Sequence, residues 1–264
     1  MKTAQILREK INADQLTVGM IATFHVWPGI IETAMKAGLD YLIIDLEHVT
    51  WPADMVAQCC AQARLLDFPV LIRPPQAEMV PVRLAMDAGP CGLMIPYVQG
   101  VETMQLVQDA VYMPPRGKRR PGGFGNFWVP DYNYETWVRE VENDFIILAQ
   151  IENKIGLSNV EAIAAHPLTT AIAIGPYDLS ADLGVCWDPA SPLLLDAVAR
   201  IREAGRKAGK NMWHIGDGPT LAGQGFTFIC VGEPLFMMMK AMTDAVKDVR
   251  NNTAVAGDTK TPLP

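Results

Sequence analysis

Two acidic residues stand directly after apolar runs of the sequence and are the first candidates for chemistry. Glu152 follows the run 146–151, and Asp178 follows the run 171–174 after a Gly-Pro turn. Both runs are typical of buried strands, and acids at the same ends of neighbouring parallel strands can hold one hard divalent cation. Each acid alone is better explained as a helix cap or an ion-pair partner. Their matching positions favour a metal site, and the lack of a histidine or cysteine cluster in the sequence favours Mg²⁺ or Mn²⁺.

Further polar residues that suit catalysis lie at other expected strand ends. Arg73 follows four apolar positions, and its guanidinium suits a carboxylate or a developing enolate. A structural ion pair with Asp45 or Glu47 is the alternative, and the two roles are compatible. His48 stands among these acids, which favours proton transfer near neutral pH. The sequence has no Gly-x-Ser-x-Gly motif and no lysine at a strand end, which disfavours a serine nucleophile and a Schiff base.

Eight apolar runs alternate with helical patterns and predict the elements that position these residues. The expected strands are 19–25, 41–45, 69–73, 92–96, 145–151, 171–175, 211–215 and 226–231. The expected helices are 29–36, 53–66, 79–88, 101–112, 155–165, 192–208 and 234–249, with a short stretch at 218–223.

Strands that are apolar on both faces, each followed by a helix, predict an α/β protein built as a closed (β/α)8 barrel. In such a barrel the polar strand ends form one rim, which is the catalytic face. An open doubly wound sheet is the alternative, but no glycine-rich phosphate loop follows the first strand.

Length and composition indicate one barrel domain over residues 1–250 and a polar tail over 251–264. The chain has 264 residues, half of them hydrophobic, and a net charge of −7, which argues against a nucleic-acid partner. The five cysteines lack metal-ligand spacing, the first residues lack a signal-peptide core, and the apolar runs are too short to cross a bilayer. We therefore expect a cytoplasmic protein that does not enter the membrane.

One connection, residues 113–144, is long and rich in proline, glycine and aromatic residues. A long loop of this kind is typical of an active-site lid or an interface arm. An ordered excursion that never meets substrate is the alternative.

Five ordered segments resemble the HpcH/HpaI aldolase family of class II, metal-dependent pyruvate aldolases. They read AGLDYLIIDLEH at 37–48, VLIRPP at 70–75, LMIPYVQ at 93–99, AQIE at 149–152 and IGPYDLSADLG at 174–184. The resemblance covers about residues 18–249. It implies a TIM barrel of the phosphoenolpyruvate/pyruvate type, with the last helix exchanged between the subunits of a homo-oligomer, a trimer or a hexamer.

The resemblance also implies roles for individual residues. Glu152 and Asp178 match metal ligands, with Mg²⁺ or Mn²⁺ expected and Co²⁺ or Zn²⁺ as alternatives. Arg73 matches an enolate-binding arginine, and His48 matches the catalytic histidine.

Other positions match residues around that centre. Gln150 matches a glutamine that contacts the pyruvyl oxygens, and Asp45 and Glu47 match the acids beside the histidine, the first catalytic and the second substrate-binding. Asp87 matches an aspartate that pairs with the histidine across a subunit boundary. The turn that receives the substrate carboxylate is matched by Gly175, Pro176 and Tyr177.

The implied activity is reversible cleavage of a 4-hydroxy-2-oxo acid into pyruvate and an aldehyde through a metal-stabilised enolate. The alternatives are a related lyase or decarboxylase acting on oxaloacetate or a malyl-type thioester, and a catalytically silent barrel. A thioester requires a site for coenzyme A, and residues 116–120 are the one basic run. Leu46 and the segment 119–122 depart from the family pattern near the second substrate, so the resemblance does not define the aldehyde.

Overall fold

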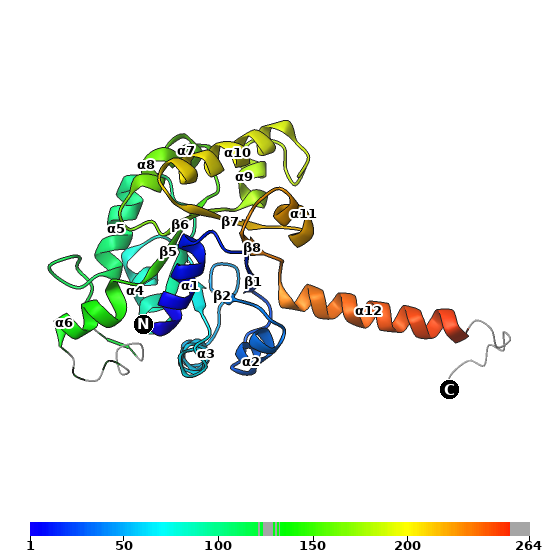
Figure 1. Cartoon of the computed structure of the whole chain (residues 1–264), viewed down its shortest axis with the longest axis horizontal. Helices are drawn as coiled ribbons and strands as arrows, with labels where there is room; N and C mark the ends of the chain where they lie inside the picture. Colours follow the sequence, from blue (N-terminus) through cyan, green and yellow to red (C-terminus); the bar gives the residue numbers. More distant parts are fainter. Residues whose placement is uncertain (121, 124–128, 130, 132, 254–264) are drawn as a thin grey trace.

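The computed structural model describes residues 1–120, 122–123, 129, 131 and 133–253. Eight parallel strands pair in chain order and close into a barrel, as predicted (Figure 1). Closure occurs where Thr17 of the first strand lies beside Phe228 of the last. The strands are β1 (Thr17–Ala22), β2 (Tyr41–Asp45), β3 (Val70–Arg73), β4 (Gly92–Ile95), β5 (Ile146–Ile151), β6 (Ala171–Ile174), β7 (Asn211–Ile215) and β8 (Phe228–Cys230).

Helices surround the barrel, and most connect one strand to the next (Figure 1). Among the described residues they are α1 (Lys2–Asn12), α2 (Gly29–Lys36), α3 (Ala53–Leu65), α4 (Met79–Asp87), α5 (Val101–Val111), α6 (Tyr134–Trp137), η2 (Val138–Glu142), α7 (Lys154–Ser158), α8 (Val160–Ala165), α9 (Pro176–Asp182), α10 (Pro192–Lys207), α11 (Gly218–Gly223) and α12 (Pro234–Thr253). None of these helices combines the length and the apolar character that crossing a bilayer requires.

Several helical features differ from the sequence prediction, among them α9, for which no helix was expected. The first residues, for which no helix was expected, form α1, which buries Ala4, Leu7 and Ile11 against the barrel. The expected helix 155–165 is interrupted at Asn159, which ends α7 and begins α8. The last helix continues four residues past its expected end, so the predicted tail begins inside α12, and residues 254–264 lie outside the described part.

The connection between α5 and β5 contains short helical segments, α6 and η2, where a loop was expected. Buried Glu142 of η2 accepts a hydrogen bond from the backbone N–H of Met113 at 2.7 Å and pairs with Arg116 at 3.1 Å. The start and end of the connection are therefore held together. Much of its aromatic-rich part, residues 121, 124–128, 130 and 132, lies outside the described residues, so a lid or interface arm stays a prediction.

An aromatic cluster fills the barrel beneath its catalytic rim. The buried Tyr41 hydroxyl donates to the carbonyl of Ile229 at 2.9 Å and accepts from the Trp213 indole at 2.8 Å. The rings of Tyr41 and Phe228 meet edge to face, with centroids 5.0 Å apart. A Cβ at Gly19 would overlap the Tyr41 ring, so only glycine fits there. The barrel is a packed core, and any cavity is confined to its ends.

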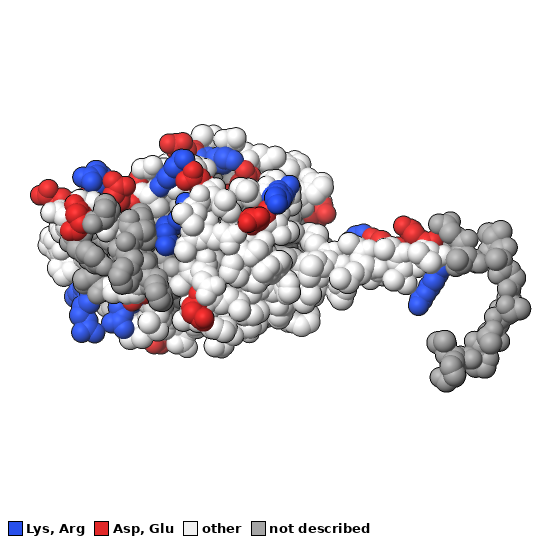
Figure 2. All heavy atoms as spheres, turned by 90° about the horizontal axis from the view of Figure 1, so that it is seen from below, with Lys and Arg blue, Asp and Glu red and all other residues white. Residues whose placement is uncertain are grey.

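The last helix, α12, leaves the barrel as a projecting arm (Figure 1). Its visible face carries few charges near the barrel (Figure 2). Large apolar side chains recur every three or four residues along it and are exposed: Met239, Met242, Val246 and Val249. Such spacing places them on one face of the helix, and that face is exposed.

Candidate active site

The predicted rim residues come together at the carboxyl ends of the strands. Asp45 and Arg73 are the last residues of β2 and β3 and lie beside each other in register. Gln150 lies in β5, and Glu152 directly follows that strand. A cavity of about 480 Å³ opens at this end of the barrel. It is lined by seven of the predicted site residues: His48, Arg73, Gln150, Gly175, Pro176, Tyr177 and Asp178.

The Arg73 guanidinium is fixed by a bidentate ion pair with Asp45. Its Nε and a terminal nitrogen donate to the two Asp45 oxygens at 2.8 and 2.7 Å, and the Asp45 side chain is fully buried. Burial alone would raise the pKa of Asp45, but Arg73, the Glu47 N–H and the Thr23 hydroxyl hold that pKa below its ordinary value. The carboxylate therefore stays ionised and holds Arg73 at the cavity wall.

The Glu152 carboxylate lies in a tight cradle of backbone. Its Oε2 accepts a hydrogen bond from the Tyr97 N–H at 2.7 Å, and Tyr97 has a φ of 53°, which is uncommon for a residue with a side chain. A Cβ at Gly175 would overlap Glu152 Oε1. Glu152 is not a helix cap, because Asn153 caps α7. A strained residue, Tyr97, and a glycine, Gly175, therefore hold this one buried carboxylate in place.

Three carboxylates gather around this cradle: Glu47, Glu152 and Asp178. Burial, together with the charges of Glu47 and Asp178, raises the pKa of Glu152 to about 8, although Tyr97 and Arg73 oppose the shift. Burial also raises the pKa of Glu47, and the charges of Arg73 and His48 oppose it. The carboxylates repel one another, which a bound cation would relieve.

Two buried acceptor atoms at this centre have no hydrogen-bond donor. One is Gln150 Oε1, and the other is Glu47 Oε2. Glu47 Oε2 lies 3.1 Å from Arg73 Nε, but the hydrogen on that nitrogen points to Asp45, so the contact is ionic without a hydrogen bond. Buried acceptors without a donor are costly and are common where a ligand or ion binds.

The donor set fits a hard divalent cation with open positions. Carboxylate oxygens are the preferred ligands of Mg²⁺ and Mn²⁺. Among the residues described here, no group of three or more His, Cys, Asp and Glu side chains is arranged to hold a metal ion. A metal on Glu152 and Asp178 would therefore keep coordination positions for water and substrate.

Sequence comparison now identifies the family. A model of the HpcH/HpaI aldolase/citrate lyase family matches residues 26–235. The chain belongs to this family. A hydroxypyruvate/pyruvate aldolase of Pseudomonas aeruginosa is 30% identical over 241 residues, which are 84% of this chain and 87% of that protein.

Two further relatives agree with the HpcH/HpaI assignment. A 4-hydroxy-2-oxovalerate aldolase of Novosphingobium aromaticivorans is 31% identical, over 87% of this chain and 89% of that protein. The crystal structure of an HpcH/HpaI aldolase from Desulfitobacterium hafniense DCB-2 superposes with a TM-score of 0.86 at 26% identity. That superposition covers 97% of this chain and 99% of the other.

Three histidines near the carboxyl ends of the strands occupy different surroundings in this HpcH/HpaI barrel. His48 is exposed, lines the cavity and interacts with the charge of Glu47. His25 lies beyond β1, which ends three residues earlier than expected, and packs on Trp27. His214 faces away from the acidic centre into a neighbouring cavity. His48 is therefore the histidine that the structure brings to the cluster of acids.

Asp87 is not brought to His48 within one protomer. It ends α4 close to the start of β4, whereas His48 follows the carboxyl end of β2 at the opposite end of the barrel. The Asp87 carboxylate pairs with buried Arg119 at 2.6 Å. Pairing of Asp87 with a histidine across a subunit boundary stays a prediction.

The structure adds residues that sequence reasoning missed. Thr23 donates to Asp45, and Glu233 accepts hydrogen bonds from the backbone N–H groups of Phe24, Leu235 and Phe236. Glu233 thereby joins the loop after β1 to the first turn of α12 at the cavity mouth. The contacts of Thr23 with Asp45 and of Glu233 with Phe24 join residues far apart in the sequence, so sequence reasoning could not find them.

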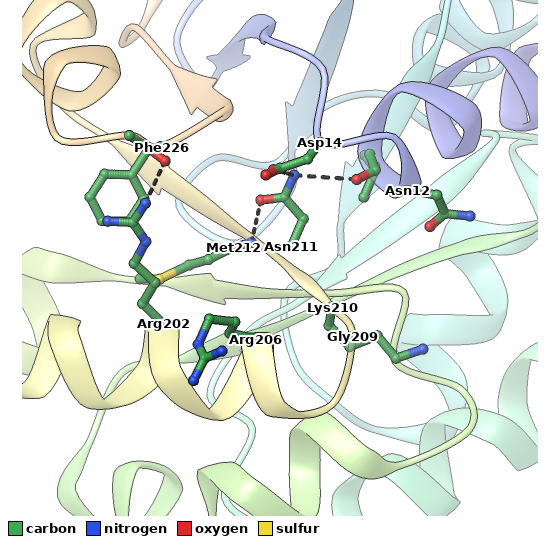
Figure 3. A pocket seen from close by; sticks show the side chains of 11 residues that line it. Asn12, Asp14, Arg202, Arg206, Gly209, Lys210, Asn211, Met212 and Phe226 are labelled. Carbon is green, nitrogen blue, oxygen red and sulfur yellow. Dashed lines mark hydrogen bonds between the residues drawn. The ribbon is translucent and has the colours of Figure 1, made fainter.

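A separate cavity of about 280 Å³ lies at the amino-terminal end of the barrel (Figure 3). Several of its polar side chains make contacts within the chain. Arg202 donates to the carbonyls of Gln224 and Gly225 and lies over the Phe226 ring, and Asn211 donates to Asp14. This cavity joins α1, α10 and β7 and lacks the converging free acceptors of the carboxyl-terminal rim.

We predict that Gly175→Ala strongly weakens metal-dependent activity while the barrel stays folded. The added methyl would displace the Glu152 carboxylate, because the new Cβ would overlap its oxygen. We expect the concentration of Mn²⁺ for half-maximal activity to rise about 10-fold or more. Activity titrations with Mn²⁺ would measure this, with Gly223→Ala as a control at a glycine that has open space around it and no positive φ. An unchanged metal requirement would contradict the cradle.

Proposed function

We propose that this chain is a divalent-metal-dependent pyruvate aldolase, a carbon–carbon lyase that reversibly cleaves 4-hydroxy-2-oxo acids into pyruvate and an aldehyde. Its membership of the HpcH/HpaI family and its aldolase-named relatives support the reaction class. The observation that carries the proposal is one cavity wall formed by Arg73, Gln150 and Asp178, with the Glu152 carboxylate interacting with Asp178 beside it.

Glu152 and Asp178 would hold the cation, and Mg²⁺ or Mn²⁺ suits their oxygen ligands, with Co²⁺ and Zn²⁺ as alternatives. When bound, such a cation supplies Lewis acidity to the oxygens of a 2-oxo acid. The two unpaired acceptors, Gln150 Oε1 and Glu47 Oε2, support the fit, since they can bind water held at the centre.

Arg73 would stabilise negative charge on the former keto oxygen as the C3–C4 bond breaks. Asp45 fixes two of its nitrogens, so the guanidinium does not reorganise during the reaction. The Gln150 amide would contact the pyruvyl oxygens from β5. The turn of Gly175, Pro176 and Tyr177 would bind the substrate carboxylate through its backbone.

His48 would accept the proton of the 4-hydroxyl group during cleavage and return it during condensation. It lines the cavity and lies near Glu47, with which it interacts electrostatically. Asp87 from a neighbouring subunit would orient this histidine. The free cysteines, four of them buried, support a reducing cytoplasmic location.

A screen of pyruvate with several aldehydes and several divalent ions tests the function. We expect condensation to depend on added metal and to stop with EDTA, and purified 4-hydroxy-2-oxo acids to release pyruvate. Oxaloacetate in a parallel reaction separates aldol cleavage from decarboxylation. Full activity of the EDTA-treated protein would contradict the proposal.

The projecting α12 supports a homo-oligomer, in line with the expected trimer or hexamer. Its apolar face is exposed along the helix, and an isolated helix gains little stability without packing. We predict that Met242→Glu lowers the molar mass measured by light scattering during size-exclusion chromatography. Lys240→Gln, on the same helix at a charged position, is the control and is expected to leave the mass unchanged. Equal masses for both variants would contradict subunit packing through this face.

A further inference from the structure

A second cavity of about 430 Å³ lies beside the active-site cavity. It is bounded by α9, α10, β7 and α11. The two cavities share four lining residues: Pro176, Tyr177, Trp187 and Ile215. Because the carboxylate-binding turn proposed above contributes two of these residues, the second cavity adjoins the place where the substrate must sit.

The second cavity as a whole is mainly apolar. Its apolar side chains are Pro189, Leu194, Leu195, Val198, Ile215 and Leu221. Its lining residues, all of them described, include no lysine or arginine. The cavity therefore cannot neutralise a carboxylate or phosphate group.

The polar groups of the second cavity are occupied by local contacts. Asp217 caps α11 by accepting from the N–H and the hydroxyl of Thr220 at 3.0 and 2.6 Å. His214 Nδ1 lies 3.0 Å from the carbonyl of Ile215, and burial lowers the pKa of this imidazole. Both features disfavour an anionic ligand, and the apolar lining then supplies the main contact for an uncharged one.

Trp187 stands at the junction of the two cavities. Its φ of 61° lies in the left-handed region, an outlier for so bulky a residue, and its side chain is 72% exposed. Its N–H donates to the Ser180 hydroxyl at 3.0 Å, which donates to the carbonyl of Tyr177 at 2.7 Å. The chain therefore holds an exposed tryptophan in an unfavourable conformation, beside Tyr177, at the entrance.

We propose that the second cavity binds the chain of the aldehyde half of the substrate, with Trp187 as a specificity-determining wall. The substrate class is then 4-hydroxy-2-oxo acids that carry an uncharged aliphatic or aromatic group at C4. This inference rests on the proposed aldolase function. The pyruvyl half occupies the acidic centre, and the apolar chain passes Tyr177 and Trp187 into the second cavity.

A homologous series of aldehydes tests the wild-type protein, with pyruvate and Mn²⁺ present. From propanal to hexanal, we expect kcat/KM to rise about two- to fourfold for each methylene that is buried. Succinate semialdehyde, which carries a carboxylate, is expected to react at least about tenfold less efficiently than pentanal, because its charge would lose water without gaining a partner. A flat series, or a preference for the charged aldehyde, overturns the inference.

Two substitutions to phenylalanine on α10 locate the effect. Val198→Phe fills the second cavity and is expected to lower the ratio of kcat/KM for hexanal to that for propanal about tenfold. Leu193→Phe, on the exposed side of the same helix, is expected to leave this ratio unchanged. If Val198→Phe leaves the ratio unchanged, or alters the oligomeric mass instead, the cavity does not bind the aldehyde chain and the inference fails.

Trp187→Gly gives a second test that does not depend on filling the cavity. Glycine adopts the left-handed conformation freely, so we expect the melting temperature to hold or rise by a few degrees. The same substitution is expected to lower the hexanal-to-propanal ratio at least about threefold, because the aromatic wall is lost. A merely structural role for Trp187 predicts no change in the ratio, and that result overturns its assignment.

Exchange of the pyruvate methyl protons in D₂O, followed by NMR without any aldehyde, distinguishes failure of the proposed function from failure of the inference about the second cavity. Exchange that depends on Mn²⁺ reports enolate formation alone. If the methyl protons exchange but kcat/KM does not depend on the chain length of the aldehyde, only the inference about the second cavity is overturned. The absence of both exchange and condensation overturns the proposed function and the inference with it.

Discussion

Glu152→Gln is expected to abolish metal-dependent pyruvate release and, at the same time, to stabilise the metal-free protein at alkaline pH. Loss of one of two carboxylate ligands is expected to reduce kcat/KM on the order of 10³-fold. The stabilisation has a separate cause. The folded protein buries this carboxyl beside Glu47 and Asp178, which raises its pKa to about 8.

The pH dependence follows from the direction of that shift. An unfolded glutamate has a pKa of about 4.3, so between that pH and about 8 the folded state binds more protons than the unfolded state. The free energy of unfolding therefore falls as the pH rises through this window, and the full cost is reached above pH 8. Glutamine removes this cost and retains an oxygen for the Tyr97 N–H.

Urea unfolding of EDTA-treated protein at pH 4.5, 7 and 9 measures the effect. We expect the variant and the wild type to have similar stability at pH 4.5, and the variant to be more stable by about 2 to 4 kcal/mol at pH 9. Glu9→Gln, at an exposed position of α1, is the control and should have little effect. A difference that is independent of pH would show that ionisation of Glu152 is not its source.

Arg73→Met is expected to cause the second large effect, on activity and on stability together. Its removal leaves the fully buried Asp45 without its bidentate partner. Breaking a buried pair in this way typically costs about 3 to 5 kcal/mol. Loss of the guanidinium from the cavity is expected to reduce kcat about 10²- to 10³-fold.

The double variant Asp45→Leu/Arg73→Met separates the two roles of the arginine. Removing both charges eliminates the unpaired carboxylate, so we expect most of the stability to return while activity stays low. Arg206→Met, which breaks an exposed pair with Glu203, is the matched control and should leave stability nearly unchanged. Recovery of activity in the double variant would exclude a direct role of Arg73 in turnover.

The barrel could be predicted from the sequence because its signals are local. Each strand is apolar on both faces, and the polar residues that end Tyr41–Asp45 and Val70–Arg73 mark the catalytic rim. The amphipathic spacing of Ala4, Leu7 and Ile11 was equally local. Even so, α1 is absent from the sequence prediction, which considers the first residues only for a signal-peptide core.

Other parts of the site depend on contacts that no local pattern reveals. Glu233 meets Phe24 across 209 positions of the chain, and this contact exists only once the barrel is closed. Trp187 lies in a connection between two helices, and nothing in its neighbours indicates that it faces two cavities. The sequence therefore predicts the residues that we propose perform chemistry, while the walls that we propose select a substrate required the folded chain.

The contacts of Glu233 link the structure of the active-site mouth to the position of α12. This carboxylate holds the loop after β1 and the first turn of α12 together, and the rings of Phe24 and Phe236 meet 6.0 Å apart. A neighbour that binds the arm and thereby shifts this turn would alter substrate affinity. Thermodynamic reciprocity then requires substrate to alter the neighbour's affinity by the same factor. Diluting the protein and saturating it with substrate would then both shift the same coupled equilibrium between binding of the neighbour and binding of substrate.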